Sequence, residues 1–543
     1  MSNPDSTSRE NPSQNLSFLP GPSDAEPRMV RNTAKIGTGL VLSRLLGLAR
    51  DICLAMALGG GWVADIFLVA FRVPNFTRRI FYEGSVALAF IPYFNRLRLQ
   101  QGLPEAFAFG RAAIWQFLTI ALVFALLCIY ASDSLALILA PGFADSPMLI
   151  ELAGRLMQIS FMYLPLVVVA TLISGMLLAL ERFTGPSVSL TCVNIAMIFA
   201  GVVAITGNYG GYRAAEIFCY GLLAGGVLQI FIQLPRLYKE GFRLFGKVSF
   251  HSRESRSFAR SAPQAVFGSA AYQLGVVISM LMASFLGEGN VSALYFAERI
   301  IELPMAVAGI ALGLVSINSF TRLTLRGRKD ELNCQLGKVL SIGLFFSLPA
   351  TFGALALAWP IMSALFGHGS FSNATLELTV TALVFYAPLL PALVMARPML
   401  AALNAGGKAF FTMLLAICSL VLLVCCNLLL FNFTSLGLEA VAISSNVSVW
   451  FNTLGLAMML RRTGVCSLHT PFFPWKSFFN YLAFSLVMGG LLLLMQYGAD
   501  LAGLGSIARA VLGLFLGMFV FFVLCGLFHS RDLKLLKRAF SRS

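Results

Sequence analysis

Charged side chains are scarce in this sequence. Only 12% of its 543 residues are Asp, Glu, Lys or Arg, whereas a soluble domain carries roughly a quarter, so a water-soluble globule is excluded. The four histidines are too dispersed to form a metal site, and the ten cysteines show no CxxC spacing and fall mostly within apolar stretches. We therefore expect no metal centre and interpret the cysteines as small apolar fillers.

Sequence signals of catalysis are also missing. Gly37-Thr38-Gly39 is followed by Leu42, where a nucleotide-binding loop needs another glycine, and no Walker sequence is present. The expected loops are short and contain no paired carboxylates of the kind that bind a metal or act as a general base. We therefore expect no ATP-driven pump and no cofactor, and we predict a transporter, not an enzyme.

Long apolar stretches are what the chain has in abundance. Hydrophobic residues make up 58% of it, and runs of about twenty, each long enough to cross about 30 Å of hydrocarbon, recur along its length. Uninterrupted runs favour a helix bundle over a barrel, whose strands alternate. We predict an all-α polytopic membrane protein with about fourteen transmembrane helices. The predicted spans lie near 33–58, 62–95, 109–131, 149–180, 186–206, 213–235, 260–286, 291–319, 335–359, 373–403, 408–431, 435–460, 476–497 and 503–528.

Basic residues distinguish the two sides of the membrane. Most of the Lys and Arg behind the net charge of +15 fall in alternate loops, such as 236–256 and 322–329, while the loops between them, such as 59–61, have almost none. The positive-inside rule places the basic loops in the cytoplasm, and an even number of spans puts both termini there. Topology explains the basic excess, so we expect no nucleic-acid partner. We interpret the polar residues 1–30 as a disordered cytoplasmic extension.

An internal repeat predicts two lobes. Tyr163-Leu164-Pro165-Leu166 recurs 223 residues later as Tyr386-Ala387-Pro388-Leu389, and residues 87–92 match 311–316 at nearly the same offset. A unit of six helices is even, so both copies share one membrane orientation and are related by a parallel pseudo-two-fold axis. Two such lobes enclose a central cavity, and their rocking gives alternating access.

This repeat sets the predicted domain boundaries. We expect the extension at 1–30, an N-lobe of spans one to six at 31–236, a cytoplasmic linker at 237–258, a C-lobe of spans seven to twelve at 259–462, spans thirteen and fourteen at 463–530, and a basic cytoplasmic tail at 531–543.

Several charges lie inside predicted spans, where each costs about 2.5–3.5 kcal/mol or more and therefore suggests a functional site. Arg44, Arg78 and Arg299 lie several residues inside three different spans, and we expect them to line a polar cavity. Because guanidinium groups bind phosphate oxygens in bidentate fashion, these residue types favour an anionic, phosphorylated substrate. The charged and polar residues of these spans are Arg44, Arg50, Asp51, Asp65, Asn75, Arg78, Arg79, Glu83, Ser292, Tyr295, Glu298, Arg299 and Glu302.

Other charges have a structural interpretation. Arg182 and Arg397 lie near span ends, from which long side chains reach the lipid headgroups, and we expect them to do so. Within the spans, neighbouring opposite charges lower each other's cost of insertion. The candidate structural ion pairs are Arg50–Asp51, Arg79–Glu83 and Glu298–Arg299.

Four stretches resemble the MurJ (MviN) family, the proposed lipid II flippases of bacterial peptidoglycan synthesis. Residues 43–51 (SRLLGLARD) and 71–84 (FRVPNFTRRIFYEG) are similar to the start of that family, 295–304 (YFAERIIELP) to its eighth-helix motif, and 365–371 (LFGHGSF) to one of its loops. The resemblance runs from about residue 30 to the C-terminus. It implies membership of the exporter superfamily that includes multidrug and oligosaccharide-lipid (MOP) transporters, with two six-helix lobes and two added helices.

The resemblance also implies a substrate and a site. The substrate would be lipid II, the undecaprenyl-pyrophosphate-linked disaccharide-peptide, moved across the bacterial inner membrane, with its tail in a groove along spans thirteen and fourteen. Membrane lipids and proteins of cell-wall synthesis or division are further expected partners. The implied substrate-binding residues are Arg44, Arg50, Asp65, Asn75, Arg78, Ser292, Arg299 and Glu302.

One departure concerns energy coupling. Some relatives have a sodium site built partly from aspartates on helices seven and eleven, but residues 261–286 and 409–431 contain no Asp or Glu here. We therefore favour export driven by the membrane potential, because moving an anion out of a negative interior is downhill. The alternatives are an exporter of another polyprenyl-linked oligosaccharide or of drugs, an enzyme acting on a polyprenyl phosphate, and a structural partner of the division machinery.

Overall fold

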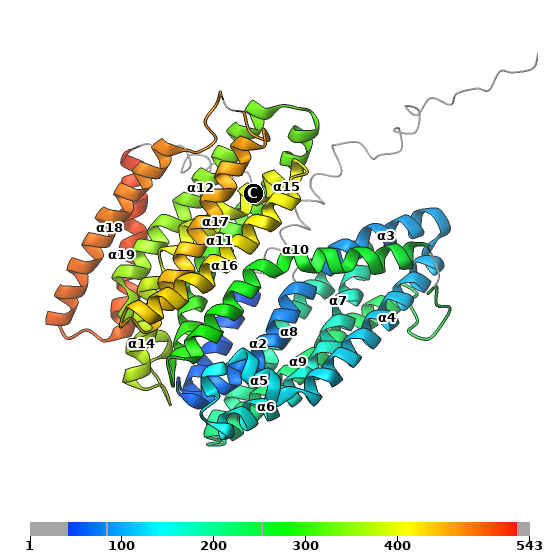
Figure 1. The fold of residues 1–543 in the computed structure, drawn as a ribbon, viewed down its shortest axis with the longest axis horizontal. Coiled ribbons are helices and arrows are strands. Elements are labelled where there is room, and N and C mark those ends of the chain that lie inside the picture. The colour runs from blue at the N-terminus through cyan, green and yellow to red at the C-terminus, as the bar shows by residue number, and fades with distance from the viewer. Residues whose placement is uncertain (1–41, 83–84, 251–252, 468, 529–543) are drawn as a thin grey trace, which may run out of the picture.

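Every regular element in the described part of the chain is a helix (Figure 1). The computed structural model describes residues 42–82, 85–250, 253–467 and 469–528, with side chains described throughout except at 80–82, 85–89, 261–272 and 306–318. The predicted extension at 1–30, the predicted tail at 531–543 and Glu83 lie outside the described residues.

The helices follow one another in two similar runs. A helix over residues 42–58 comes first. The first run continues with α2 (Trp62–Tyr82), α3 (Ser85–Gln101), α4 (Leu103–Tyr130), α5 (Ser132–Leu139), the short 3-10 helix η2 (Pro141–Phe143), α6 (Pro147–Phe161), α7 (Tyr163–Ala179), α8 (Thr184–Thr206) and α9 (Gly211–Lys239). The second run consists of α10 (Arg253–Ser284), α11 (Asn290–Leu325), α12 (Lys329–Ala356), α13 (Ala358–Phe366), α14 (Asn373–Tyr386), α15 (Leu389–Ala405), α16 (Ala409–Phe433) and α17 (Leu438–Arg462). Two more helices, α18 (Trp475–Leu501) and α19 (Ser506–Leu527), complete the described chain.

The two runs correspond in length and in neighbours. The helices α4 and α12 each have 28 residues, and each is followed by a short helix, α5 or α13. In the first run α9 contacts α7 and α8, and in the second run α17 contacts α15 and α16 in the same way. The single helix α11 contacts α12, α14 and α15, as α2 and α3 together contact α4, α6 and α7. Sequence reasoning expected one span over residues 62–95; the described helices of this stretch are α2 and α3, and residues 83–84 between them lie outside the described residues.

At two corresponding places, a break between consecutive helices lies at or just before a proline. The break between α6 and α7 precedes Pro165, and that between α14 and α15 contains Pro388, with a bend of 47° between α14 and α15. Proline has no N–H to donate, so it is tolerated at or near the start of a helix and disrupts a helix interior. The two copies of the repeat motif, at 163–166 and 386–389, lie at these breaks.

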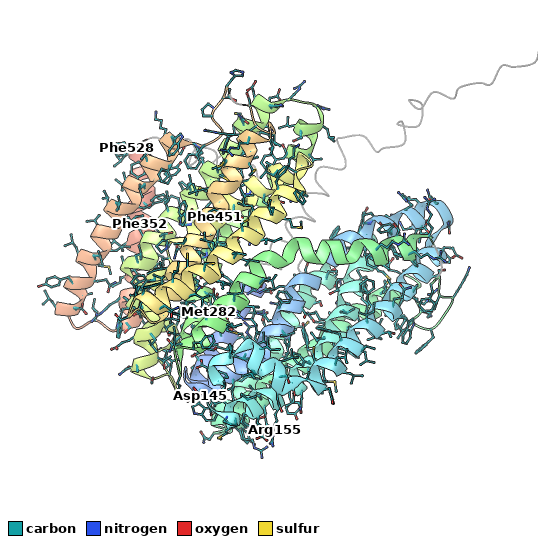
Figure 2. The ribbon with its side chains drawn as sticks, in the orientation of Figure 1. Asp145, Arg155, Met282, Phe352, Phe451 and Phe528 are labelled. Carbon is teal, nitrogen blue, oxygen red and sulfur yellow. The ribbon has the colours of Figure 1, made fainter. Side chains whose placement is uncertain are left out.

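The protein is a multi-pass membrane protein. Within the described residues, nine helices are long and apolar enough to cross a membrane, or ten if the bent pair α14 and α15 forms one span. Apolar side chains such as Phe451 on α17 and Phe528 after α19 face outward, whereas the exposed charged residues Asp145 and Arg155 lie together at one end of the first run (Figure 2). The helix over residues 42–58, α2 and α11 are not among the apolar candidates, and these three carry the candidate site.

The arrangement of the runs positions that site. The two runs lie close together at one end and diverge toward the end where α3 and α17 finish (Figure 1). Between them, α10 contacts α3 and α4 of the first run and α16 and α17 of the second. The pair α18 and α19 packs against α12 and α13, away from the first run. The two halves also touch directly where α2 contacts α11.

Candidate functional site

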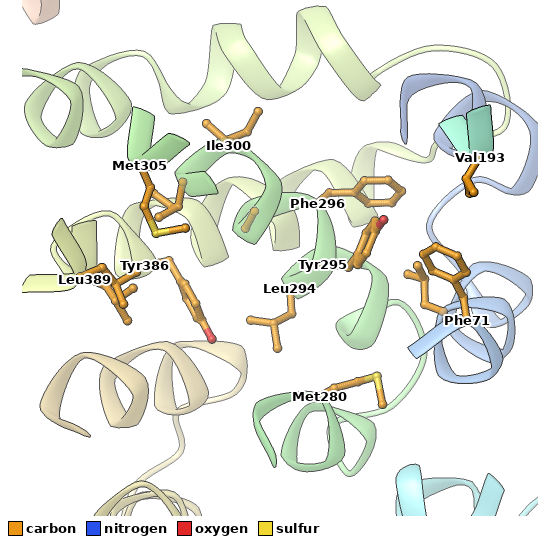
Figure 3. Packing of buried hydrophobic residues seen from close by; sticks show 14 of the residues in the cluster. Phe71, Val193, Met280, Leu294, Tyr295, Phe296, Ile300, Met305, Tyr386 and Leu389 are labelled. Atoms are coloured by element: carbon orange, nitrogen blue, oxygen red, sulfur yellow. The ribbon is translucent and has the colours of Figure 1, made fainter. Parts of the chain in front are cut away.

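Charged side chains of both halves cluster where the helix over residues 42–58, α2 and α11 meet. Buried hydrophobic residues pack on the same helices, and Figure 3 shows Phe71 of α2 near Tyr295 and Phe296 of α11. In the described residues, ion pairs connect five arginines with three carboxylates: Arg44, Arg50, Arg72, Arg79 and Arg299 with Asp51, Glu298 and Glu302. Arg78 precedes Arg79 on α2 and hydrogen-bonds to Asn75. When Arg78 is counted with the cluster, three positive charges remain.

The innermost part of the cluster is organised around Asp51 and Tyr295. Asp51 is fully buried, and its Oδ1 accepts from Nη2 of Arg50 at 2.7 Å and from the hydroxyl of Tyr295 at 3.0 Å. Oδ2 of Asp51 lies 2.6 Å from Nε of Arg299 in an ion pair. The Tyr295 hydroxyl in turn accepts from Arg50 at 3.1 Å and from Arg299 at 2.8 Å. Each buried charge therefore has a partner of opposite sign, which burial in a low-dielectric site requires.

A second carboxylate, Glu302, gathers three arginines from three helices. Its Oε1 lies 2.7 Å from Nη1 of Arg79 on α2, and its Oε2 lies 2.7 Å from Nη1 of Arg299 and 3.6 Å from Nη1 of Arg44. Because Ser292, Tyr295, Arg299 and Glu302 repeat at helical spacing, they share one face of α11. The structure directs this face at the first half of the chain.

The arginines differ in their access to solvent. The side chain of Arg50 is 3% exposed and that of Arg299 is 10% exposed, whereas Arg44 is 26% exposed. Arg78 is half-buried and its Nη2 donates to Oδ1 of Asn75 at 3.1 Å. The cluster thus has a buried, paired layer and a more accessible layer, and the accessible layer can present guanidinium donors to an anion while the buried ion pairs of Arg50 and Arg299 stay intact.

The predicted residues Asp65 and Ser292 lie at a different place, where α11 begins. Oδ2 of Asp65 accepts from the backbone N–H of Gly289 at 2.7 Å, and Oδ1 accepts from that of Ser292 at 2.8 Å. The Ser292 hydroxyl donates to the carbonyl of Gly60 at 2.6 Å. Asp65 is in the first turn of α2, so its carboxylate caps the α11 N-terminus from another helix while lying near the positive end of α2.

Further contacts close this end between the halves. The Trp62 N–H donates to Oε1 of Glu288 at 3.1 Å, and the Ser370 N–H donates to the carbonyl of Met56 at 3.1 Å. Gly59 has φ +69°, and a Cβ there would lie 2.5 Å from the carbonyl oxygen of Ser370. Only glycine fits this approach of the two backbones. We call the contacts of residues 56–65 with 288–292 and 370 the closed end.

Sequence reasoning missed three contributors. Oδ1 of Asn194 on α8 accepts from Nη1 of Arg50 at 3.2 Å, and its Nδ2 donates to the carbonyl of Ser43. Nη2 of Arg72 lies 3.9 Å from Oε2 of Glu298, whereas the sequence predicted Arg299 as the ion-pair partner of Glu298. Glu288 belongs to the closed end. A lone amide within an apolar span was the available signal for Asn194, since a buried polar group needs a partner.

The remaining predicted residues lie elsewhere. Nε of Arg182 forms a 2.7 Å ion pair with Glu240 at an exposed position, and Nη2 of Arg397 lies 3.7 Å from Sδ of Met305. Among the described residues, no group of three or more His, Cys, Asp or Glu side chains is placed to hold a metal ion.

Known proteins resemble this chain in sequence over most of its length. The family model described as lipid II flippase MurJ matches residues 54–511. A probable lipid II flippase MurJ of Rhizobium meliloti (strain 1021) is 31% identical over 434 residues, which is 78% of this chain and 79% of the relative.

Two solved structures share the fold. A lipid II flippase MurJ in an inward closed conformation superposes with a TM-score of 0.75 at 20% identity, covering 92% of this chain and 99% of that one. An inward-facing multidrug resistance MATE family transporter of the MOP superfamily gives a TM-score of 0.63 at 18% identity, covering 78% and 95%. The family match over most of the chain, together with the 31% identical relative, shows that this protein belongs to the lipid II flippase MurJ family.

Proposed function

We propose that this protein moves lipid II from the cytoplasmic to the outer leaflet of the bacterial inner membrane by alternating access. The single observation that supports this most is the charged cluster, which combines residues of both halves and retains three positive charges among the described residues. A pyrophosphate is the part of lipid II that such a cluster would bind, because guanidinium groups match its oxygens in bidentate geometry.

The two layers of the cluster take different roles in this proposal. Arg44 and Arg78 are accessible enough to meet the head group directly. Arg50 and Arg299 are held by Asp51 and Glu302 and keep the accessible arginines in place. The substrate would compete with carboxylates for the accessible guanidinium groups, so binding can loosen the contact between the halves.

Topology follows from adding the helices of the cluster to the apolar ones. The helix over residues 42–58, the pair α2 and α3, α10 and α11 would bring ten candidate spans to fourteen. The predicted N-lobe at 31–236 and C-lobe at 259–462 would then be two copies of one six-helix unit, joined by the linker at 237–258. Both termini would lie in the cytoplasm, because the basic loops follow α3, α9, α11 and α17.

This orientation makes the closed end the outer gate. The carboxylate of Asp65 holds the start of α11 against α2, so opening outward requires breaking its two hydrogen bonds. The undecaprenyl tail would stay in lipid along α18 and α19, whose outward faces are apolar, with Phe515 and Phe519 both mostly exposed. Proteins of cell-wall synthesis or division remain proposed partners for export of this substrate.

The test is direct measurement of lipid II in the outer leaflet. Cells depleted of their own flippase are supplied with this protein or with an empty vector, and lipid II accessible to an externally added hydrolytic toxin is quantified. We expect accessible lipid II to appear only with the protein. Growth rescue without accessible lipid II, or export of another polyprenyl-linked oligosaccharide instead, would overturn the assignment.

A further inference from the structure

A second cationic site lies outside the charged cluster, at the end of the second half where three turns meet. The turns connect α11 to α12, α15 to α16, and α17 to the segment before α18. They border a partly open cavity with a volume of about 140 Å³. We call it the turn cavity; its lining residues used below are Thr324, Gly327, Lys329, Gly406, Lys408 and Thr463.

Two lysines give the turn cavity its charge. Lys329 is the first residue of α12, and Lys408 precedes the first residue of α16. Nζ of Lys329 reaches toward the third turn and would lie 3.7 Å from a Cβ on Gly464. Among the residues that the structure describes, no carboxylate pairs with either ammonium group. The N-termini of α12 and α16 add further positive potential at the same place.

Thr324, on the last turn of α11, also lines the turn cavity, and its Oγ1 is covered by surrounding atoms and has no hydrogen-bond partner among the described residues. The packing of the turns is also tight, since a Cβ on Gly406 would lie 2.6 Å from Cγ2 of Val465.

The first half differs at the corresponding positions. The C-cap residue of α9 is Glu240, which pairs with Arg182, and the residue before α8 is Phe183. In the second half, the C-cap residue of α17 is Thr463 and the residue before α16 is Lys408. The second half therefore has a lysine and no carboxylate at these two positions.

We propose that the turn cavity binds the phosphate group of an anionic phospholipid of the cytoplasmic leaflet. Two ammonium groups without a carboxylate partner in the described residues, together with two helix N-termini, suit a phosphate oxyanion. Exposed apolar side chains flank the lining residues, with Leu325 81% and Phe410 65% exposed, and these would lie beside acyl chains. Anionic lipids are attracted to basic residues at this membrane face.

The experiment measures lipid binding to the purified full-length protein. Phosphatidylglycerol is titrated in neutral phosphatidylcholine nanodiscs, and binding is followed by native mass spectrometry. The variant Lys329→Gln/Lys408→Gln should weaken phosphatidylglycerol binding about 25-fold, at about fivefold for each lysine. Thr324→Val, which keeps the side-chain shape and removes only a covered hydroxyl, should leave phosphatidylglycerol binding unchanged.

A matched variant separates the cavity from general surface charge. Arg326→Gln/Arg462→Gln removes the same charge from exposed positions at the same end without touching the lining, and we expect less than a threefold effect. Equal losses in both double variants would overturn the proposal. So would full competition by inorganic phosphate at the same concentration, because the ligand would then be free phosphate and not a lipid. A folding defect would show as a lower Tm in phosphatidylcholine alone, which Thr324→Val should leave unchanged.

Discussion

The hydroxyl of Tyr295 donates a hydrogen bond to Oδ1 of Asp51 at 3.0 Å, and through it α11 of the second half is tied to the first half. The same oxygen accepts from Arg50 and Arg299, so one phenol group satisfies three charged partners. Its position explains how two guanidinium groups can lie close together in a buried place, since a neutral acceptor and a shared carboxylate stand between them.

Tyr295→Phe should therefore lower both stability and transport. Removing hydrogen bonds to buried charged groups costs about 1.5–3 kcal/mol each, less what the partners regain by rearranging. We expect a lower Tm of the purified protein and severalfold slower appearance of lipid II in the outer leaflet of proteoliposomes.

Tyr386→Phe is the matched control, because the Tyr386 hydroxyl lies 3.1 Å from Oγ of Ser445, a contact within the second half. It should lower Tm with little effect on transport. Equal transport rates in the two variants would contradict a role for Tyr295 between the halves.

Arg44 and Arg299 should respond differently to loss of the guanidinium group. Arg299→Ala leaves Asp51 and Glu302 short of a buried partner, and breaking a buried pair costs about 3–5 kcal/mol. Arg44→Ala removes one 3.6 Å contact of a partly exposed side chain, which is worth less than about 1 kcal/mol. Both variants, and Arg78→Ala, should abolish lipid II export, but only Arg299→Ala should lower Tm strongly.

Arg44→Lys refines this test, since it keeps the charge and loses the bidentate fork; we expect partial export. Arg182→Ala and Arg397→Ala, both outside the cluster, should export normally. Normal export by Arg44→Ala and Arg78→Ala would show that the accessible layer does not bind the head group.

Sequence periodicity predicted the face of α11 that carries the cluster, because the positions of Tyr295, Arg299 and Glu302 follow from local helix geometry. It did not predict the partners. Glu298 and Arg299 are adjacent, and adjacent residues on a helix point about 100° apart, so Glu298 meets Arg72 while Arg299 turns to Asp51. Pairing across helices depends on tertiary packing, which one sequence does not contain.

At the closed end, the sequence likewise indicated one member of the contact but not its partners. Asp65 was identified because a carboxylate inside an apolar span is costly. Its partners are the backbone N–H groups of Gly289 and Ser292, and a backbone donor leaves no signal in residue type. The apolar stretches and the proline-containing repeat gave most of the helices.

Export should depend on the membrane potential. A pyrophosphate with two charges that crosses the full field outward gains about 4–5 kcal/mol per 100 mV. Residues 261–286 and 409–431 contain no Asp or Glu, so the acidic sodium site of some relatives has no carboxylate there. When the membrane potential of proteoliposomes is collapsed and the Na⁺ and H⁺ gradients are held constant, the rate of lipid II export should fall at least tenfold. Unchanged export under that treatment would refute potential-driven transport, and dependence on Na⁺ alone would point to a different coupling site.

A disulfide across the closed end should stop transport reversibly. The backbones of Met56 and Ser370 are joined by a 3.1 Å hydrogen bond, and cysteines at these positions would test that approach, with bridging followed as the loss of free thiols. If this end is the outer gate, oxidised Met56→Cys/Ser370→Cys cannot open outward, and export should fall to background and recover on reduction. Each single variant, oxidised in parallel, should export normally and controls for the native cysteines. Export by the fully cross-linked protein would mean that the substrate leaves by a route that does not separate residues 56 and 370, and the two halves would then not need to part at this end.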